Sequence, residues 1–242
     1  MRVALFATCL VDQLRPQVGL ATVRVLEKAG VEVDFDPRQT CCSQPAFNSG
    51  YRDEARSVAR HFLDVFGQAD AIVSPSGSCT AMVRHLKELF PEGSGEHELA
   101  TSIATRTHEL ASFLVRELGI DDLGARFDGT LTWHDACHGL RDLGLKDEPR
   151  RLLSKVEGAR FVEMEAADTC CGFGGTFSVK YPEISVAILD RKLERLRSME
   201  VDAIVSSDAS CLMQLSGRLT RTLSPLRTLH IAQVLAGVEE FG

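Results

Sequence analysis

Eight cysteines occur in an order that is used twice along the chain. Each set has a single cysteine, an adjacent pair and a second single cysteine: Cys9, Cys41, Cys42 and Cys79, then Cys137, Cys170, Cys171 and Cys211. The offsets between matching positions are 128, 129, 129 and 132 residues. Such self-similarity at a long period indicates two copies of one structural unit.

Four thiols can supply all the ligands of a [4Fe–4S] or [2Fe–2S] cluster, or of tetrahedral zinc. In a reducing compartment, eight free cysteines favour metal or redox chemistry over disulfides. Adjacent cysteines reach one centre only from a turn, because neighbouring side chains of a strand point to opposite faces. Gly172 permits such a turn after the second pair. Ser43 stands at the matching position of the first half, where we expect a different turn.

The elements that must position these thiols also repeat. Residues 2–9 and 129–137 are β-rich runs that end in a cysteine, and both precede helical segments. The segments "DAIVSPSGSC" (70–79) and "DAIVSSDASC" (202–211) are nearly identical at their start. Strands that alternate with helices predict parallel βαβ units with helices over the sheet. We therefore predict an α/β protein of two pseudo-repeated lobes, each a small, mainly parallel sheet flanked by helices.

The lobe boundaries are expected at residues 1–120 and 121–242, and the lobes are expected to face one another across a cleft. Each lobe is expected to close with an amphipathic helix that begins at His108 or His230, the second running to residue 241. The cysteines follow the carboxyl ends of strands, where open α/β sheets bind their ligands. Each set of four thiols is therefore expected to converge at one edge of its sheet.

Charge and hydropathy exclude several classes of function. The net charge is −7, and no basic cluster accompanies aromatic residues, so a nucleic-acid partner is not expected. No apolar stretch approaches the roughly 20 residues that span a bilayer, so no membrane span is expected. The short apolar run at the N-terminus suits a strand better than a secretory signal. We expect a cytoplasmic protein.

The polar side chains near the cysteines are not predicted to be catalytic. His134 and His138 flank Cys137, and we expect one of them to hydrogen-bond near the site rather than to activate a nucleophile. His108 and His230 are expected at helix starts, packed against the sheets. Lys180 is expected to be solvated.

The segments around the cysteines resemble those of a known family. "FATCLVD", "CCSQPAFNSGY", "SPSGSC", "CHGLRDLGLKDEP", "TCCGFGGTFSVK" and "SCLMQLSGRL" cover both halves of the chain. They resemble the lactate-utilization protein A family. Its cysteine-rich CCG domain also occurs in heterodisulfide reductases and in the iron–sulfur subunits of glycolate oxidases.

The resemblance implies an iron–sulfur electron-transfer subunit of a cytoplasmic L-lactate-oxidising complex, with other subunits of that complex as partners. It implies one cluster per repeat, of the [4Fe–4S] type, held by the two sets of cysteines. The chain would then be an oxidoreductase subunit rather than a stand-alone enzyme.

One departure from the heterodisulfide reductase pattern leaves alternatives open. That pattern ends each half with C-x-x-C, whereas this chain has Ser76 and Asp208 at the first of those positions. Four ligands per half suit an ordinary centre. Zinc remains an alternative at each site, in a structural or assembly module or as a substitute after aerobic purification. A thiol–disulfide oxidoreductase that uses the adjacent cysteines directly is the third hypothesis.

Overall fold

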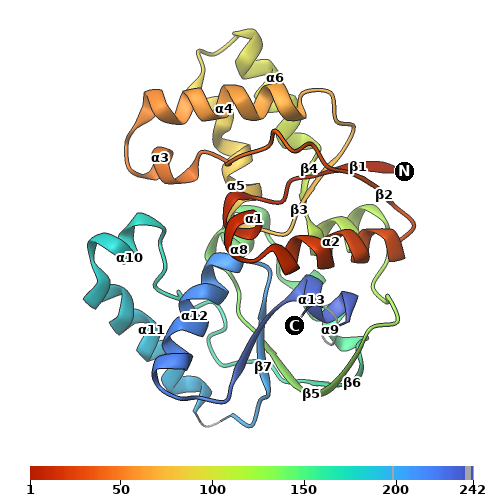
Figure 1. Cartoon of the computed structure of the whole chain (residues 1–242), viewed down its shortest axis with the longest axis vertical. Coiled ribbons are helices and arrows are strands. Elements are labelled where there is room, and N and C mark those ends of the chain that lie inside the picture. Colours follow the sequence, from red (N-terminus) through yellow and green to blue (C-terminus); the bar gives the residue numbers. More distant parts are fainter. Residues whose placement is uncertain (198, 238–240, 242) are drawn as a thin grey trace.

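The computed structural model describes residues 1–197, 199–237 and 241, and it shows two α/β lobes (Figure 1). The upper lobe in Figure 1 contains a sheet of order β2-β1-β3-β4, and the lower lobe a sheet of order β6-β5-β7-β8. All strand pairs within the two sheets are parallel. The predicted α/β class and the repeated lobes are confirmed.

The elements of the first lobe are β1 (Arg2–Leu5), α1 (Cys9–Leu14), α2 (Pro16–Lys28), β2 (Glu32–Asp34), α3 (Gln44–Asn48), α4 (Arg52–Phe66), β3 (Ile72–Ser74), α5 (Gly77–His85), the 3-10 helix η1 (Leu86–Leu89), α6 (Gly95–Thr105), β4 (Thr107–Glu109), α7 (Leu110–Ser112) and the π-helix η2 (Phe113–Glu117). Those of the second lobe are β5 (Arg126–Trp133), α8 (Cys137–Leu143), α9 (Asp147–Ser154), β6 (Glu157–Phe161), α10 (Thr176–Lys180), α11 (Pro182–Leu196), β7 (Ala203–Ser206), α12 (Ala209–Arg221), β8 (Arg227–His230) and α13 (Ile231–Ala236).

The repeated "DAIV" segments form a buried central strand of each sheet, β3 and β7. Alternating residues of a strand face opposite sides of its sheet. Ile72 and Ile204 accordingly belong to the outer cores of their own lobes, whereas Val73 and Val205 belong to one core that both lobes share. The short edge strand β2 is largely exposed, as an edge with fewer neighbours allows.

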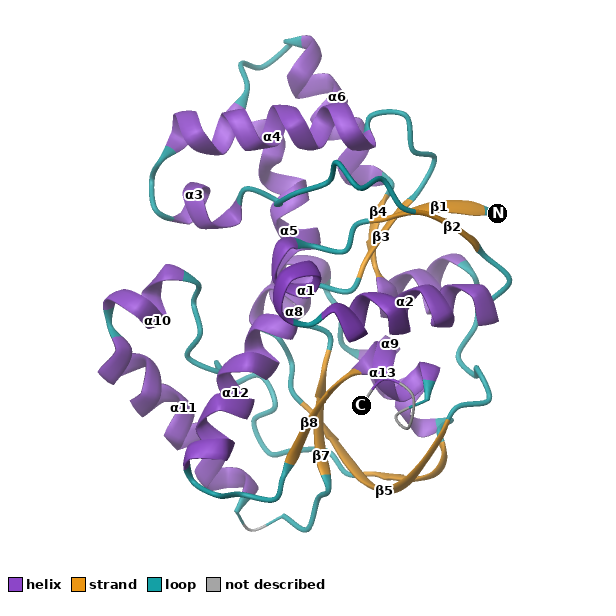
Figure 2. Ribbon diagram, viewed as in Figure 1, coloured by secondary structure: helices purple, strands orange, loops and turns teal. Residues whose placement is uncertain are grey.

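The helices are exchanged between the lobes in a two-fold pattern. The closing helix of the second lobe, α13, packs on α2 of the first, and α7 packs in the same way on α9. Around the centre, α5 contacts α8 and α1 contacts α12. Figure 2 shows α1, α5 and α8 between the two sheets. Each lobe thus completes its partner's inner face.

The two lobes are in direct contact at the centre of their junction, so the expected cleft does not run through the whole of it. Ser76 and Asp208 form an antiparallel bridge, and the amide of Gly77 donates to the carbonyl oxygen of Ser207 (3.4 Å). A Cβ on Gly77 would lie 3.1 Å from the Cα of Gly139, so the two backbones approach closely. The segments that follow the carboxyl ends of β3 and β7 therefore cover each other.

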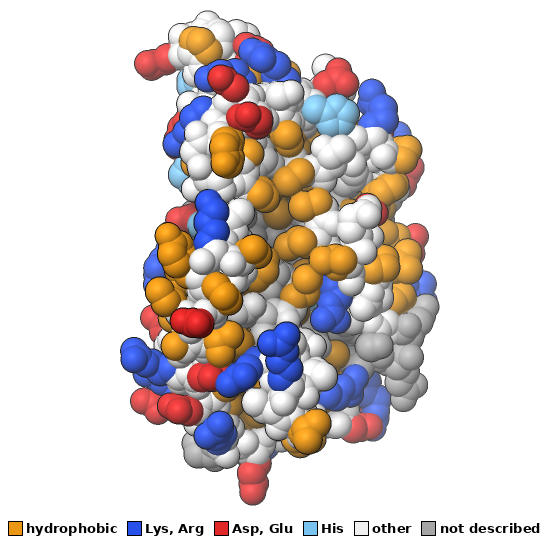
Figure 3. All heavy atoms as spheres, turned by 60° about the vertical axis from the view of Figure 1, so that its left-hand side comes forward, with side chains coloured by type: hydrophobic (Ala, Val, Ile, Leu, Met, Phe, Trp, Pro, Cys, Tyr) orange, Lys and Arg blue, Asp and Glu red, His pale blue; other side chains and the backbone are white. Residues whose placement is uncertain are grey.

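One side of this junction is hollowed. Figure 3 shows hydrophobic side chains gathered across the middle of that face, around a depression between the upper and lower lobes. The two lobes also meet through the hydroxyls of Ser49, after α3, and Thr176, in α10, which lie 3.3 Å apart. The adjacent segments expose Tyr51, Val179 and Tyr181.

Two further expectations concern the ends of the lobes. The second closing helix is confirmed over Ile231–Ala236, while residues 238–240 of the expected helix lie outside the described residues. The chain passes from one sheet to the other between Glu117 and Arg126, within which the predicted boundary at residues 120 and 121 falls. Among the described residues, no helix combines the length and the apolar character needed to cross a membrane.

Candidate metal centres

The single cysteines of both sets lie in the first turns of helices at the lobe junction. Cys9 is the first residue of α1 and Cys137 the first of α8. Cys79 and Cys211 are each the third residue of their helices, α5 and α12. The N-terminus of such a helix carries unpaired N–H groups and a partial positive charge, which stabilise a thiolate.

The adjacent pairs lie in turns, and each turn places a residue of positive φ directly after the second cysteine. Ser43 has φ 77° and Gly172 has φ 82°, so the expected difference between the turns is not found in the φ of this residue. The hydroxyl of Ser43 donates to the carbonyl oxygen of Ala55 (2.8 Å). In the second lobe the hydroxyl of Ser185, at the position of Ala55, donates to the carbonyl oxygen of Gly172 (2.7 Å). One hydrogen bond between turn and helix therefore supports each pair, with donor and acceptor exchanged.

The four thiols of the first set interact with one another. The sulfur atoms of Cys9 and Cys41 lie 3.7 Å apart. Hydrogen bonds from Cys42 and Cys9 lower the pKa of Cys41 to about 3. The thiols of Cys41 and Cys79, together with burial, raise the pKa of Cys42. One thiolate is thus stabilised by protonated neighbours, and a bound cation would favour ionisation of the others.

In the second set Cys171 and Cys211 are in direct contact, while Cys137 and Cys170 lie near enough to affect the ionisation of their neighbours. The sulfur atoms of Cys171 and Cys211 lie 3.0 Å apart, and the amide of Gly172 donates to the sulfur of Cys170 (3.3 Å). The thiol of Cys171 raises the pKa of Cys170, and burial followed by the charge of Cys170 raises the pKa of Cys137. Cys171 and Cys211 are buried, whereas Cys170 is exposed. The set therefore extends from the protein interior to the surface.

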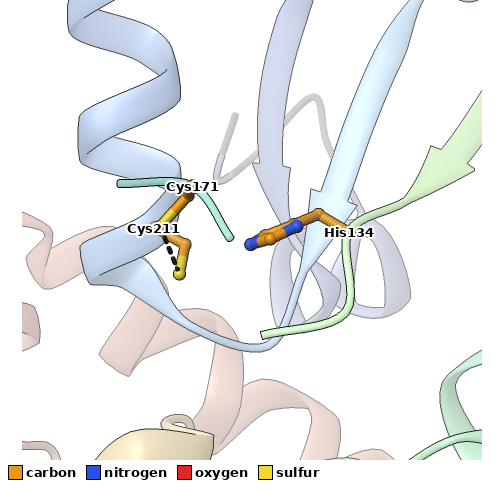
Figure 4. Close-up of side chains that lie close together, drawn as sticks. All are labelled: His134, Cys171 and Cys211. Atoms are coloured by element: carbon orange, nitrogen blue, oxygen red, sulfur yellow. Dashed lines mark hydrogen bonds between the residues drawn. The ribbon is translucent and has the colours of Figure 1, made fainter. Parts of the chain in front are cut away.

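His134 lies in the second site. From the sequence we expect only that His134 or His138 hydrogen-bonds near it. The ring of His134 is 1% exposed, and neither nitrogen has a hydrogen-bond partner within the described part of the chain. Ligand atoms of His134, Cys171 and Cys211 all lie within 4.8 Å of one another (Figure 4). Burial, then the charge of Lys192, lowers the pKa of His134 to about 3, so the ring is neutral. A neutral imidazole and thiolates are both metal ligands.

Lys192 was not predicted as a site residue. Its side chain is completely buried in α11, and its ammonium donates to the carbonyl oxygens of Ala167 (3.1 Å) and Thr169 (2.9 Å). Burial lowers the pKa of Lys192 to about 8, and the charges of Cys171 and Cys211 act in the opposite direction. Its position in the middle of a charged, amphipathic segment gave no signal of this role.

The other polar residues named from the sequence lie outside the thiol sets. His138 pairs with Asp142 (2.7 Å), and Lys180 is exposed as expected. His230 is the last residue of β8 and caps α13; it is buried, with its Nε2 3.0 Å from the carbonyl oxygen of Pro75. His108 lies within β4, so the expected helix start at that residue is wrong. The counterpart of His230 is Glu109 rather than His108, because Ser74 pairs with Glu109 as Ser206 pairs with His230. The sequence signal for this alignment is the dipeptide Arg-Thr, which occurs shortly before Glu109 and shortly before His230, at residues 106–107 and 227–228.

Ser76 and Asp208 stabilise the junction at the positions where C-x-x-C would add thiols. Asp208 accepts hydrogen bonds from the amide and hydroxyl of Ser78 in the other lobe (2.8 and 3.2 Å) and from the hydroxyl of Ser210 (2.8 Å). The hydroxyl of Ser76 accepts from the amide of Cys79 (3.3 Å). Both side chains are therefore engaged in contacts within the protein.

Comparison with known proteins agrees with this doubled arrangement. The family model described as "Cysteine-rich domain" matches residues 3–84 and again residues 131–216. "Lactate utilization protein A" of Geobacillus thermodenitrificans is 44% identical over 235 residues, which cover 97% of this chain and 98% of the relative. The chain belongs to the lactate utilization protein A family. Its relative of the same name from Exiguobacterium is 46% identical over 235 residues, covering 96% of each chain.

Among solved structures, this family member is similar to glutamate racemase of Francisella tularensis, with a TM-score of 0.38 and 10% identity over 97% of this chain and 78% of that one. Only the sequence relatives therefore bear on the function of this chain. Eight cysteines within a doubled cysteine-rich domain suggest metal binding. The geometry is compatible with it, since burial of unpartnered His134 beside two thiols is costly without a ligand to compensate.

Proposed function

We propose that the chain is an iron–sulfur electron-transfer subunit of a cytoplasmic L-lactate-oxidising complex. The observation that carries the proposal is the doubled gathering of thiols at the carboxyl ends of two equivalent sheets, at one lobe junction. The relatives' name, "Lactate utilization protein A", supports lactate as the source of electrons. All eight cysteines are free thiols, so both sets are available as ligands.

Each set of four cysteines would hold one cluster, of the [4Fe–4S] type. Cys9, Cys41, Cys42 and Cys79 are the proposed ligands of the first, and Cys137, Cys170, Cys171 and Cys211 those of the second. Such a cluster supplies reversible one-electron chemistry when bound. The chain's own contribution is to fix the thiolates in turns and first helical turns, and to aim backbone N–H groups at sulfur, as Gly172 does at Cys170 (3.3 Å).

The proposed subunit works with other subunits of the complex. Cys170 is exposed, so the second site would lie close to a surface where a partner could dock. The hollowed, apolar face between the lobes is another surface that a partner could cover (Figure 3). Electrons from a two-electron hydroxyacid oxidation would enter the relay one at a time. The chain would be part of an oxidoreductase rather than a complete enzyme.

The test is metal and sulfide analysis of protein purified without oxygen. We expect iron, acid-labile sulfide and absorption near roughly 400 nm, as thiolate-ligated clusters show. Cys42→Ser/Cys79→Ser and Cys171→Ser/Cys211→Ser should each remove about half of the iron, because each pair belongs to one four-thiol site. Ser49→Ala, which lies outside both thiol sets, is the control and should retain all of it.

Other results would favour the alternatives. Stoichiometric zinc without sulfide, after expression in iron-rich medium, would establish the zinc-binding module instead. Protein free of both metals, with one thiol of each adjacent pair alkylated much faster than the rest, would favour the thiol–disulfide oxidoreductase.

A further inference from the structure

The two lobes differ in one pair of buried residues beside the thiols. Phe6 lies three residues before Cys9, and His134 lies three residues before Cys137. Phe62 and Lys192 occupy the same position, the eleventh, in the equivalent 15-residue helices α4 and α11. In the first lobe Phe6 and Phe62 pack edge to face, with ring centroids 5.0 Å apart. The second lobe replaces this aromatic pair with an imidazole and an ammonium.

The imidazole of His134 faces the sulfurs of the second site (Figure 4). Neither nitrogen of His134 is hydrogen-bonded within the described residues, and a ligand atom of the ring lies within 4.8 Å of the sulfurs of both Cys171 and Cys211. Figure 4 shows the ring directed toward the two cysteines from the end of β5. A neutral imidazole that donates its N–H to a cluster sulfur adds no negative charge, and such a hydrogen bond raises the reduction potential of the cluster.

The ammonium of Lys192 lacks a carboxylate partner. Its hydrogen bonds go to the carbonyl oxygens of Ala167 and Thr169, in the segment that leads to Cys170, and in the described chain it takes part in no salt bridge. Cys171 and Cys211 are the leading charges that favour its protonated form. A buried cation is costly unless an anion lies close to it. Asp135 and Asp168 also favour the protonated form, less than the two thiols do, and a negatively charged centre at the second site would add to them.

We propose that His134 and Lys192 hold the second centre at a higher reduction potential than the first. This inference rests on the proposed function. Reduction adds one negative charge, which the imidazole and the ammonium stabilise in the second lobe, while Phe6 and Phe62 leave the first site without such groups. Electron transfer between the centres is then directed from the first lobe to the second. In that step the first centre is oxidised by one electron and the second is reduced by the same electron, with no bond or proton exchanged.

The experiment is a redox titration of anaerobic, iron-loaded protein, followed by electron paramagnetic resonance. We expect two midpoint potentials in the unaltered protein. Cys42→Ser/Cys79→Ser should leave only the higher one, and Cys171→Ser/Cys211→Ser only the lower. His134→Phe introduces the residue that the first lobe has at the equivalent position, and Lys192→Met removes the ammonium. Each variant should shift the higher potential down toward the lower one without loss of iron or sulfide.

Lys180→Met is the matched control, because it removes the same charge from an exposed position of α10. It should leave both potentials unchanged. A single shared potential, or a second-lobe centre that titrates below the first, would overturn the inference while iron and sulfide still supported the proposed function. Protein without iron or sulfide would instead refute the proposed function itself. The assignment by cysteine variants decides the order of potentials even where His134→Phe or Lys192→Met fails to fold.

Discussion

Ser43 and Gly172 show how different residues serve the same backbone conformation. Both are left-handed, but a Cβ on Gly172 would lie 2.3 Å from the carbonyl oxygen of Ser185. Ser43 has room for its Cβ and uses its hydroxyl to bind Ala55. The left-handed conformation alone costs a side chain roughly 1–2 kcal/mol, and a backbone clash adds to it.

We therefore expect Gly172→Ala to lower the free energy of unfolding by about 2–4 kcal/mol, from left-handed strain and a forced backbone shift. Ser43→Ala keeps its Cβ and loses one hydrogen bond, so it should cost only about 1 kcal/mol. Urea unfolding of the two variants under reducing conditions measures both values. Equal losses would show that the two turns are not constrained in these different ways.

At the scale of secondary structure, buried titratable residues begin the closing helices of both lobes. Glu109 caps α7 by accepting from the amide of Ser112 (3.1 Å), and His230 caps α13 by accepting from the amide of Ala232 (3.1 Å). Glu109 is fully buried, and one of its oxygens has no partner among the described residues. Burial raises the pKa of Glu109 from 4.5 to about 8.

This burial predicts a pH-dependent stability. Between pH 4.5 and about 8, the folded protein holds a proton on Glu109 that the unfolded chain has released, so stability falls as pH rises. Glu109→Gln keeps the capping oxygen and cannot ionise. It should stabilise the protein progressively from pH 5 to pH 8, by up to about 1.4 kcal/mol per pH unit. Thermal unfolding at several pH values tests this, and a gain that does not depend on pH would contradict it.

The elements that the sequence predicted best are those with strong local patterns. The "DAIV" strands, the helices after them and the cysteines at strand ends follow from composition and spacing. The equivalence of Glu109 with His230 was not predicted, because His108 and His230 are separated by nearly as many residues as the matched cysteines are. The strand register gives the true alignment, since Ser74 pairs with Glu109 and Ser206 with His230. Lys192 escaped notice because a lysine in an amphipathic helix is ordinarily solvated; its burial depends on the carbonyl groups of a distant turn.

At the scale of the whole molecule, the packed junction could not be predicted from the sequence. A hydrophobic position predicts burial but not the lobe against which it packs. Leu26 of α2 and Leu235 of α13 belong to the same core although they are far apart in the chain. Lys28 also binds the carbonyl oxygen of Ala236 (3.0 Å), so α2 holds the end of the closing helix of the other lobe.

The exchanged helices predict that the lobes unfold together. Trp133, the single tryptophan, is buried in β5 and reports on the second lobe, whereas Leu63 lies in the outer core of the first. Leu63→Ala should lower stability by about 2–5 kcal/mol. If the shared core couples the lobes, the urea midpoint of Trp133 fluorescence should fall with that of circular dichroism in reduced, chelator-treated protein.

The matched variant is Leu193→Ala, at the equivalent position of α11 in the second lobe. In a coupled molecule both variants shift both signals, because loss of either outer core removes support from the same inner one. In a molecule of independent lobes, Leu63→Ala would leave the Trp133 transition unchanged and Leu193→Ala alone would move it. The exchange of α13 and α7 between the sheets predicts the first result, since neither lobe can open its inner face without exposing that of the other.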